Sequence, residues 1–489
     1  MVIPYSTAHL PGQLFLNNEY VDAKNTRTLA TYNPRDGVLL SDKIPVAGEE
    51  DVDLAVAYAE DAFRTWKHVQ ASRRRQMLFK LADLMEEHAE SLASISRLEI
   101  GASMTSTSDE IAGAIEGIRY YAGWIDKLAG ESFPQDDGFL KIVRHEPLGV
   151  TAAIIPWNGP LITIGLKAAP ALASGNCFIL KPSEKASLSP LAFGSLVKAA
   201  GFPPGVFQIL SGDGETGSLL ASHMRIRKIT FTGSGPTGRK IQEMAAKSNL
   251  KRVTLELGGK SPAVVFDDCN LENAVRWTVQ GITMNSGQVC FAASRVYVQE
   301  GIYDRFVEAY LEALKAKSEA MKNQTNGSLG PLIDQAQFNR VMGFIARGQN
   351  GQGTLALGGA RIGDKTFRQG FFLEPTVFTD VDVGSEIHTH EIFGPISVLR
   401  RFKTEEEIMA LSNGTSFGLM AGVFSQDINK ALRVASDFES GMVGVNCISL
   451  NFFNVPFGGV KESGIGRECG AYALKAFTEP KTIMVNMTY

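Results

Sequence analysis

The sequence predicts an α/β fold in which helices cover both faces of a parallel sheet. From residue 148 onward, short runs rich in strand-forming residues alternate with helical stretches, and this alternation is typical of parallel sheets. Two of these runs lead into glycine-rich turns. The first third of the chain instead repeats apolar residues at the three- and four-residue spacing of amphipathic helices.

The elements follow from these patterns in chain order. Helices are expected over residues 49–68, 72–101, ended by Gly101, and 109–130. Strands are expected over 149–157, 176–183, 205–212, 228–235 and 253–259, separated by helices over 160–173, 186–200, 214–223 and 236–247. Residues 259 to about 450 repeat the alternation less regularly, with strands over 294–300, 395–402, 420–427 and 441–446, which predicts a second α/β domain.

Two segments fit neither domain. Residues 130–149 and 477–489 read as extended. Because an exposed strand edge invites strand addition, both could pair with another subunit.

Composition excludes several classes of function. The chain has 489 residues, of which 44% are hydrophobic and 20% charged, and its net charge is −4. It has no basic block, so nucleic acid is not an expected partner. An odd number of scattered cysteines without metal-site spacing indicates free thiols in a reducing compartment. They are Cys177, Cys269, Cys290, Cys447 and Cys469.

Targeting and membrane signals are not found either. The N-terminal stretch lacks a basic region followed by an apolar core, so no secretory signal is expected. The longest uncharged run, residues 147–166, is interrupted by Pro156, Asn158, Gly159 and Pro160. We therefore expect a strand, a turn and a helix start there rather than a membrane span, and a cytoplasmic location.

A G-x-G-x-x-G pattern at Gly233, Gly235 and Gly238 follows a predicted strand and opens a predicted helix. Such glycines let the backbone approach a phosphate at a helix N-terminus. They are about as often needed only for packing. If the pattern binds a dinucleotide, Glu256, which lies 18 residues after Gly238, would hold the ribose.

Three further motifs carry polar groups that are ambiguous alone. Lys181 and Glu184 in "LKPSEKAS" could hold a ribose or form a solvated charge pair. Asn158 in "PWNGP" could donate to an oxyanion or stabilise its own turn. Glu256 in "LELGGKSP" could be a general base with a raised pKa or a strand-end carboxylate facing water.

Cys290 in "NSGQVCFAAS" is a candidate nucleophile among small, uncharged neighbours, although a buried cysteine is usually a small hydrophobe. His388, His390 and Glu391 cluster in "IHTHEIFGP", but no second ligand cluster has suitable spacing, so no metal site is expected. No feature ties any histidine to Cys290 as in a thiol hydrolase.

The order of these motifs is more informative than each alone. "PWNGP", "KPSE", "FTGS…G", "ELGGKSP", "GQVC", "EIFGP" and "PFGGVKESGIGRE" together resemble the NAD(P)-dependent aldehyde dehydrogenase family, from residue 17 to about 478. The resemblance implies that Cys290 attacks the aldehyde carbon and that the Asn158 amide, with the Cys290 N–H, stabilises the oxyanion. It also implies that Glu256 activates the hydrolytic water, which replaces its assignment to the ribose.

The resemblance further implies NAD as cofactor, with NADP possible. Lys181 and Glu184 would bind the adenosine ribose, Glu391 the nicotinamide ribose, and the turn at Gly233 and Ser234 would lie near the pyrophosphate. Other implied cofactor contacts are Pro156, Trp157, Ser183, Gly214, Phe231, Leu257 and Phe393, and Lys167 would lie close to the site without a definite role. NAD⁺ is expected over NADP⁺ because a 2′-phosphate would lie against the Glu184 carboxylate.

By the same resemblance the substrate tunnel is lined by Gly159, Thr163, Leu166, Met284, Val289 and Phe291, with Asn451, Phe452 and Phe453 at the mouth. Many relatives carry an aromatic residue at the position of Gly159, and several carry tryptophan at that of Leu166. We therefore expect a wide apolar tunnel that accepts a bulky or aromatic aldehyde. Gly235 stands where relatives usually have a larger side chain, which predicts a looser cofactor turn.

The implied domains are a Rossmann-like NAD-binding domain (1–126 and 148–258), a catalytic domain (259–450), oligomerisation segments (127–147 and 470–489) that form a small β extension, and a return to the cofactor domain (451–469). A homodimer or homotetramer is expected. The alternatives are a CoA-acylating dehydrogenase, which would lack the hydrolytic Glu256, a thiol hydrolase, which needs no dinucleotide, and a catalytically silent binding or structural protein on the same fold.

Overall fold

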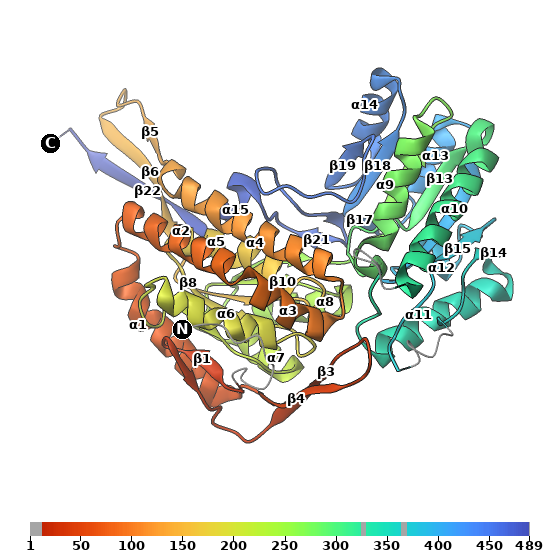
Figure 1. The fold of residues 1–489 in the computed structure, drawn as a ribbon. Coiled ribbons are helices and arrows are strands. Elements are labelled where there is room, and N and C mark those ends of the chain that lie inside the picture. The colour runs from red at the N-terminus through yellow and green to blue at the C-terminus, as the bar shows by residue number, and fades with distance from the viewer. Residues whose placement is uncertain (1–11, 324–328, 363–368, 489) are drawn as a thin grey trace.

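The computed structural model describes residues 12–323, 329–362 and 369–488. Residues 1–11 of the expected cofactor domain and residue 489 of the expected C-terminal strand lie outside these ranges. Figure 1 shows two α/β bodies, the first coloured mostly red to yellow and the second green to blue, and a small strand extension at the end of the first. The α/β prediction is confirmed.

An eight-stranded sheet forms the first body. Its five central strands are parallel: β7 (Val150–Ile154), β8 (Cys177–Lys181), β9 (Phe207–Ile209), β10 (Lys228–Thr232) and β11 (Arg252–Glu256). Antiparallel strands complete its edges: β1 (Leu14–Leu16) and β2 (Glu19–Val21) beyond β9, and β21 (Gly464–Ile465) beside β11. Every residue of β7 and β8 is buried, as expected for strands covered on both faces.

Helices cover both faces of this sheet. Helices α5 (Pro160–Ala173) and α6 (Leu188–Ala199) lie on one face, beneath an outer layer of α2 (Ala71–Glu87), α3 (Ala89–Ile100) and α4 (Met104–Trp124). Helices α1 (Glu49–Trp66), α7 (Gly214–Ser222) and α8 (Gly235–Lys247) lie on the other. The helix expected over 72–101 is interrupted at His88, which leaves helical geometry at φ −103° and ψ 14°, and Gly101 ends α3 at φ +71° as predicted.

The second body contains a seven-stranded sheet. In spatial order its strands are β14 (Thr354–Leu357), β15 (Thr376–Thr379), β16 (Ile396–Phe402), β13 (Arg295–Gln299), β12 (Pro262–Val265), β18 (Met420–Phe424) and β19 (Met442–Val445), of which only β14 is antiparallel to its neighbour. Its helices are α9 (Leu271–Thr283), α10 (Tyr303–Lys322), α11 (Gln335–Arg347), α12 (Glu386–Thr389), α13 (Glu405–Asn413) and α14 (Ile428–Asp437).

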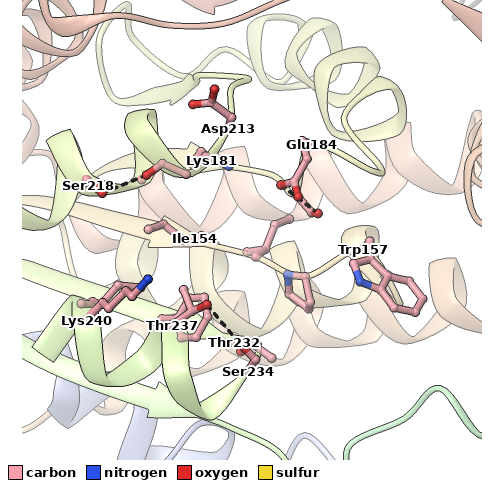
Figure 2. Close-up of a pocket in the computed structure, with 18 of the residues that line it drawn as sticks. Ile154, Trp157, Lys181, Glu184, Asp213, Ser218, Thr232, Ser234, Thr237 and Lys240 are labelled. Atoms are coloured by element: carbon pink, nitrogen blue, oxygen red, sulfur yellow. Dashed lines mark hydrogen bonds between the residues drawn. The ribbon is translucent and has the colours of Figure 1, made fainter. Parts of the chain in front are cut away.

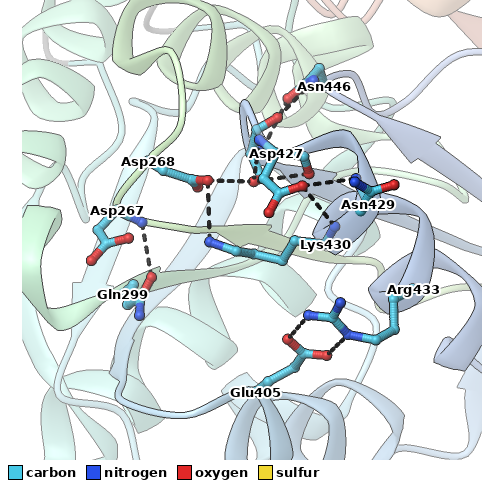
Figure 3. Close-up of polar contacts among 10 residues, drawn as sticks. Asp267, Asp268, Gln299, Glu405, Asp427, Asn429, Lys430, Arg433 and Asn446 are labelled. Carbon is cyan, nitrogen blue, oxygen red and sulfur yellow. Dashed lines mark hydrogen bonds and ion pairs between the residues drawn. The ribbon is translucent and has the colours of Figure 1, made fainter.

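Ion pairs and a helix cap lie at the carboxyl edge of the second sheet. Figure 3 shows the Lys430 ammonium paired with Asp268 at 3.1 Å, and both carboxylate oxygens of Glu405 accepting from Arg433. Asp427 caps α14 by accepting from backbone N–H groups of its first turn. In α/β sheets ligands usually bind at the carboxyl edge, but here charged side chains that cap and join helices occupy it.

The two extended segments pair with each other within the chain. Strand β6 (Phe139–Pro147) lies between β22 (Thr478–Asn486) and the short β5 (Glu131–Phe133), all antiparallel. Their extended conformation is confirmed, and this three-stranded sheet projects from the first body (Figure 1). The remaining small elements are the hairpin β3 (Thr28–Tyr32) and β4 (Leu39–Pro45), the pair β17 (Phe417–Gly418) and β20 (Val460–Lys461), and α15 (Gly470–Ala476).

Across the described ranges, none of the helices combines the length and the apolar character that crossing a bilayer requires.

Candidate active site

Polar and glycine residues follow the ends of the central strands of the first sheet. The turn after β7 carries Trp157 and Asn158, the turn after β8 carries Ser183 and Glu184, and β10 leads through Gly233 into α8. Carboxyl ends of parallel strands meet at one edge of a sheet. The residues predicted from separate motifs therefore converge on one side of the molecule.

A cavity of about 590 Å³ opens at this edge. Figure 2 shows Lys181, Glu184 and Asp213 along one wall, and Thr237 and Lys240 of α8 along the other. Nine predicted cofactor residues line it: Pro156, Trp157, Lys181, Ser183, Glu184, Gly214, Phe231, Gly233 and Ser234. The sequence interpretation did not include Ile154, Asp213, Ser218, Thr237, Lys240, Ile241 or Met244, which also line the cavity.

Two of the fingerprint glycines are required by packing. A Cβ at Gly233 would lie 2.4 Å from the Phe231 ring, and one at Gly238 would lie 2.7 Å from Leu257. Leu257 therefore packs behind the first turn of α8, although it was predicted to contact the cofactor. A Cβ at Gly235 would meet only an Arg239 nitrogen at 3.5 Å, so this position has room for a side chain.

The predicted ribose pair occupies two different environments. The Lys181 ammonium is buried and donates to the Pro182 carbonyl at 2.9 Å. Burial lowers the pKa of Lys181, and the charges of Glu184 and Asp213 oppose this shift. Glu184 is exposed at the rim, so its carboxylate is available to hydroxyl groups of a ligand.

A strained turn precedes Cys290. Asn285 and Ser286 follow α9 with φ +45° and +56°, a left-handed conformation that non-glycine residues rarely adopt. The Gln288 side chain holds this turn: its amide donates to the carbonyls of Asn285 and Pro331, and its oxygen accepts from a backbone N–H. Strain that surrounding contacts hold in place is typical of functional sites.

The Asn158 amide joins the two bodies beside Cys290. Its Nδ2 donates to the Gln288 backbone carbonyl at 2.8 Å, and the backbone carbonyl of Asn158 accepts from Asn285 Nδ2 at 3.1 Å. One hydrogen of the Asn158 amide is used in this contact, and an amide NH₂ has two. The second hydrogen is available to a group bound at the thiol.

The Cys290 thiol is partly exposed and faces two carboxylates. Removal from bulk water and the negative charges of Glu391 and Glu256 raise the pKa of Cys290, while the N–H groups of Cys290 and Phe291 lower it less. Without a ligand the group is therefore a thiol at neutral pH.

Glu256 ends β11 with a side chain that is 2% exposed, and neither carboxylate oxygen has a hydrogen-bond partner among the described residues. Burial and the negative charge of Glu468 raise the pKa of Glu256 well above its usual value, and the charges of Lys167 and Arg467 oppose this. The Lys167 ammonium is buried and paired with Glu468. Glu256 does not line the cavity of about 590 Å³.

Glu391 and Phe393 reach the site from the second body. Glu391 accepts from the Gly259 N–H at 3.2 Å, and removal from water raises the pKa of Glu391 to about 7. Phe393 has φ +62° and its ring meets that of Trp157 edge-on at 5.5 Å between centroids. Neither residue lines the cavity. Phe393 lies next to Trp157, which does line it, and Glu391 lies close enough to the Cys290 thiol for its charge to act on it.

The predicted substrate residues do not all meet around Cys290. Leu166, Phe291 and Phe453 join one apolar cluster with it, together with Tyr120, Ile162, Leu419, Met442 and Phe457, which the motifs did not predict. A Cβ at Gly117 would lie 2.6 Å from the Phe453 ring. Phe453 therefore packs closely against α4.

The other tunnel residues lie elsewhere. Met284 lines a separate polar cavity of about 270 Å³, and Val289 packs on the core of the second sheet. Thr163 is buried, with its hydroxyl donating to the Gly159 carbonyl. Phe452 is 59% exposed and Asn451 partly exposed. Local hydrogen bonding and packing decide where each of these side chains points.

The histidine cluster takes part in packing. His388 is buried and its Nε2 lies 2.8 Å from the Tyr297 hydroxyl, and burial lowers the pKa of His388 to about 3. Within residues 12–323, 329–362 and 369–488, no group of three or more His, Cys, Asp or Glu side chains has the geometry to hold a metal ion.

Comparison with known proteins agrees with this geometry. A sequence model described as the Aldehyde dehydrogenase family matches residues 20–483. The chain is 45% identical over 480 residues to an aldehyde dehydrogenase of Agaricus bisporus, covering 97% of this chain and 95% of that one. It is 43% identical to human retinal dehydrogenase 2, covering 97% and 92%. The structure of an NAD⁺ complex of aldehyde dehydrogenase from Bacillus cereus superposes with a TM-score of 0.93 at 41% identity, covering 97% and 96%.

The family model and the relatives identify the chain as an oxidoreductase that acts on aldehydes. The chain belongs to the aldehyde dehydrogenase family, whose enzymes act on the aldehyde group.

The thiol environment leads to a pH prediction. Only the thiolate reacts with an alkylating agent, so without cofactor the alkylation rate of Cys290 by iodoacetamide rises through pH about 9 without a plateau. Glu256→Gln removes one of the charges that raise the pKa and shifts the profile to lower pH. The control Glu243→Gln, an exposed carboxylate on α8, leaves it unchanged. Mass spectrometry of the Cys290 peptide measures the rates, and a plateau below pH about 8 contradicts the account.

Proposed function

We propose that this chain oxidises an apolar aldehyde to the carboxylic acid through a covalent bond to Cys290, with NAD⁺ as the hydride acceptor. Three observations support the proposal: the Asn158 amide donates to the Gln288 carbonyl two residues before Cys290, the Glu256 charge acts on the Cys290 thiol, and the Glu256 carboxylate has no hydrogen-bond partner among the described residues. Nucleophile, oxyanion donor and base are what acyl chemistry at a carbonyl requires.

The residues around the large cavity fit a dinucleotide. The cavity lies at the N-termini of α7 and α8, where backbone N–H groups favour phosphate. Lys181 and Glu184 would hold the adenosine ribose and Glu391 the nicotinamide ribose, while Trp157 and Phe393 border the path between them. When bound, NAD⁺ supplies the acceptor for the hydride that leaves the substrate carbon. The structures of related enzymes bound to NAD⁺ support the same choice.

The side chains then divide the chemistry. Cys290 attacks the aldehyde carbon to give a thiohemiacetal, whose oxyanion the Asn158 amide and the Cys290 N–H stabilise. After oxidation the acyl group remains on Cys290 as a thioester. Glu256, whose pKa is raised by burial and by Glu468, takes a proton from the water that attacks the thioester. This glutamate argues against a CoA-acylating enzyme, and the presence of Cys290, Glu256 and Asn158 argues against a silent binding protein.

We assign the first sheet, with residues 12–126, 148–258 and 451–469, to cofactor binding and the second, within residues 259–450, to catalysis. Strand β21 supports the return to the cofactor domain because it pairs with β11. We assign the β5–β6–β22 sheet to association of the chain into a dimer or tetramer, because it projects from the body and exposes Phe133 and Met484. The native mass in solution tests this assignment. Five unpaired cysteines support a cytoplasmic location.

An aldehyde panel tests the activity and the substrate class. Because Tyr120, Ile162, Leu166 and Phe457 make the surroundings of Cys290 apolar, we expect a larger kcat/KM for a bulky aryl or long-chain aldehyde than for acetaldehyde, measured by NADH absorbance. We expect betaine aldehyde, a cation, to be a poor substrate because Gly159 offers no aromatic face where many relatives carry one. Cys290→Ala abolishes turnover. Preference for acetaldehyde refutes the substrate class, and turnover by Cys290→Ala refutes the mechanism.

Cofactor choice gives a second test. A 2′-phosphate at the ribose site would face the exposed Glu184 carboxylate, and two such charges repel by about 1–4 kcal/mol. We expect NAD⁺ to bind about tenfold or more tightly than NADP⁺, and Glu184→Gln to narrow this ratio by improving NADP⁺ binding. Comparable kcat/KM values with the two cofactors would mean that the carboxylate does not discriminate.

A further inference from the structure

Two of the helices that follow the site turns, α5 and α6, lack side-chain caps of their own. Helix α5 begins after Gly159, which has no side chain to offer, and α6 begins after Ser187, whose hydroxyl donates instead to the Ser183 carbonyl. The first backbone N–H groups of a helix have no partner within it. In most helices a Ser, Thr, Asp or Asn at the N-cap accepts from them.

Two glutamates from the outer helical layer supply both missing caps. Glu110 of α4 accepts from the N–H groups of Leu161 and Ile162, at 2.7 and 3.3 Å, with a single carboxylate oxygen. Glu99 of α3 caps α6 and uses both of its carboxylate oxygens. It accepts from the N–H groups of Leu188 and Ser189, the latter at 2.9 Å, and from the Ser189 hydroxyl at 2.8 Å. In each case the carboxylate is remote in sequence from the helix it caps.

These contacts are built into the interior. Glu99 is 1% exposed, and the Ser96 hydroxyl donates to the second oxygen of Glu110 at 3.2 Å, which ties α3 to α4. Burial raises the pKa of both carboxyls to about 7, while the N–H donors lower it. Buried carboxylates are costly unless hydrogen-bonded, and here the helix N–H groups are their partners.

Each capped helix start directly follows one half of the site. Asn158 lies one residue before Gly159, so the α5 end that Glu110 holds also fixes the turn that presents the Asn158 amide. Ser183 and Glu184 lie in the turn before α6, the end that Glu99 holds. The outer helices α3 and α4 therefore contact the Glu184 turn and the Asn158 turn, respectively, through two separate carboxylates.

We propose that Glu110 and Glu99 are positioning residues for different halves of the site: Glu110 holds the Asn158 turn for the chemistry at Cys290, and Glu99 holds the Glu184 turn for the adenosine end of the cofactor. This inference rests on the proposed function. Neither carboxylate touches the substrate or cofactor, so each acts only through the helix end it caps.

Substituted full-length chains separate the two roles. Glu110→Leu leaves the α5 N–H groups unpaired and lowers kcat at saturating NAD⁺ by about 10- to 100-fold, since small displacements of an oxyanion donor are costly. Its Kd for ADP-ribose, titrated by calorimetry without aldehyde, stays unchanged. Glu99→Leu gives the reverse, with Kd for ADP-ribose raised about tenfold and kcat at saturating cofactor retained.

Conservative variants and a surface control complete the test. Glu110→Gln keeps the single oxygen that accepts from both α5 N–H groups, so it restores the wild-type value. The two α6 N–H groups use different oxygens of Glu99, so Glu99→Gln keeps one of the two contacts and raises the Kd for ADP-ribose less than Glu99→Leu does. Glu110→Asp and Glu99→Asp retract the carboxylate and give the same separation as Leu if the Leu variants do not fold. The control Glu116→Leu, on the exposed face of α4, changes neither readout.

The outcomes are distinguishable. Equal effects of the Glu110 and Glu99 variants on kcat and Kd, or Gln variants as damaged as Leu variants, overturn the inference. If the unmutated chain oxidises no aldehyde, the proposed function fails by itself. The ADP-ribose titration still decides the Glu99 role, because an unchanged Kd in Glu99→Leu contradicts it.

Discussion

The site depends on a close approach of the two sheets at Gly258 and Gly259, which connect β11 to β12. A Cβ at Gly258 would lie 2.3 Å from the Glu391 carboxylate, and one at Gly259 would lie 2.4 Å from the Cys290 carbonyl oxygen. Any side chain there would displace one of the two groups. Because Gly258 and Gly259 have no side chains, the carboxyl edge of the first sheet can lie against the turn before β13 of the second sheet. The hydrogen bond from Asn158 to Gln288 also joins these two parts.

This crowding also sets the electrostatics of the site. Besides burial, the charges of Glu391 and Glu256 raise the pKa of Cys290, and the charge of Glu468 raises the pKa of Glu256. The buried Lys167, paired with Glu468, offsets part of this negative charge. A bound cationic ring would offset more of it, since a nearby positive charge favours thiolate.

Motifs that are short and local in sequence could be predicted. Asn158, Glu256 and Cys290 lie in such motifs, and the cavity brings together nine of the predicted cofactor residues. What could not be predicted depends on partners remote in the chain: Lys167 and Glu468 are 301 residues apart, and Glu110 is 51 residues from the helix N–H it accepts from. The close contact of Phe453 with Gly117 likewise depends on tertiary packing, which no local pattern records.

The central claim is that Cys290 carries the acyl group until Glu256 delivers water to it. The most direct measurement is the mass of the Cys290 peptide from Glu256→Gln, after mixing with NAD⁺ and an aryl aldehyde and rapid acid quenching. The account predicts that this peptide gains the mass of the acyl group, that NADH forms in one equivalent and then stops, and that hydroxylamine removes the added mass. An unmodified Cys290 after NADH has formed, or the acyl group on another residue, would contradict it.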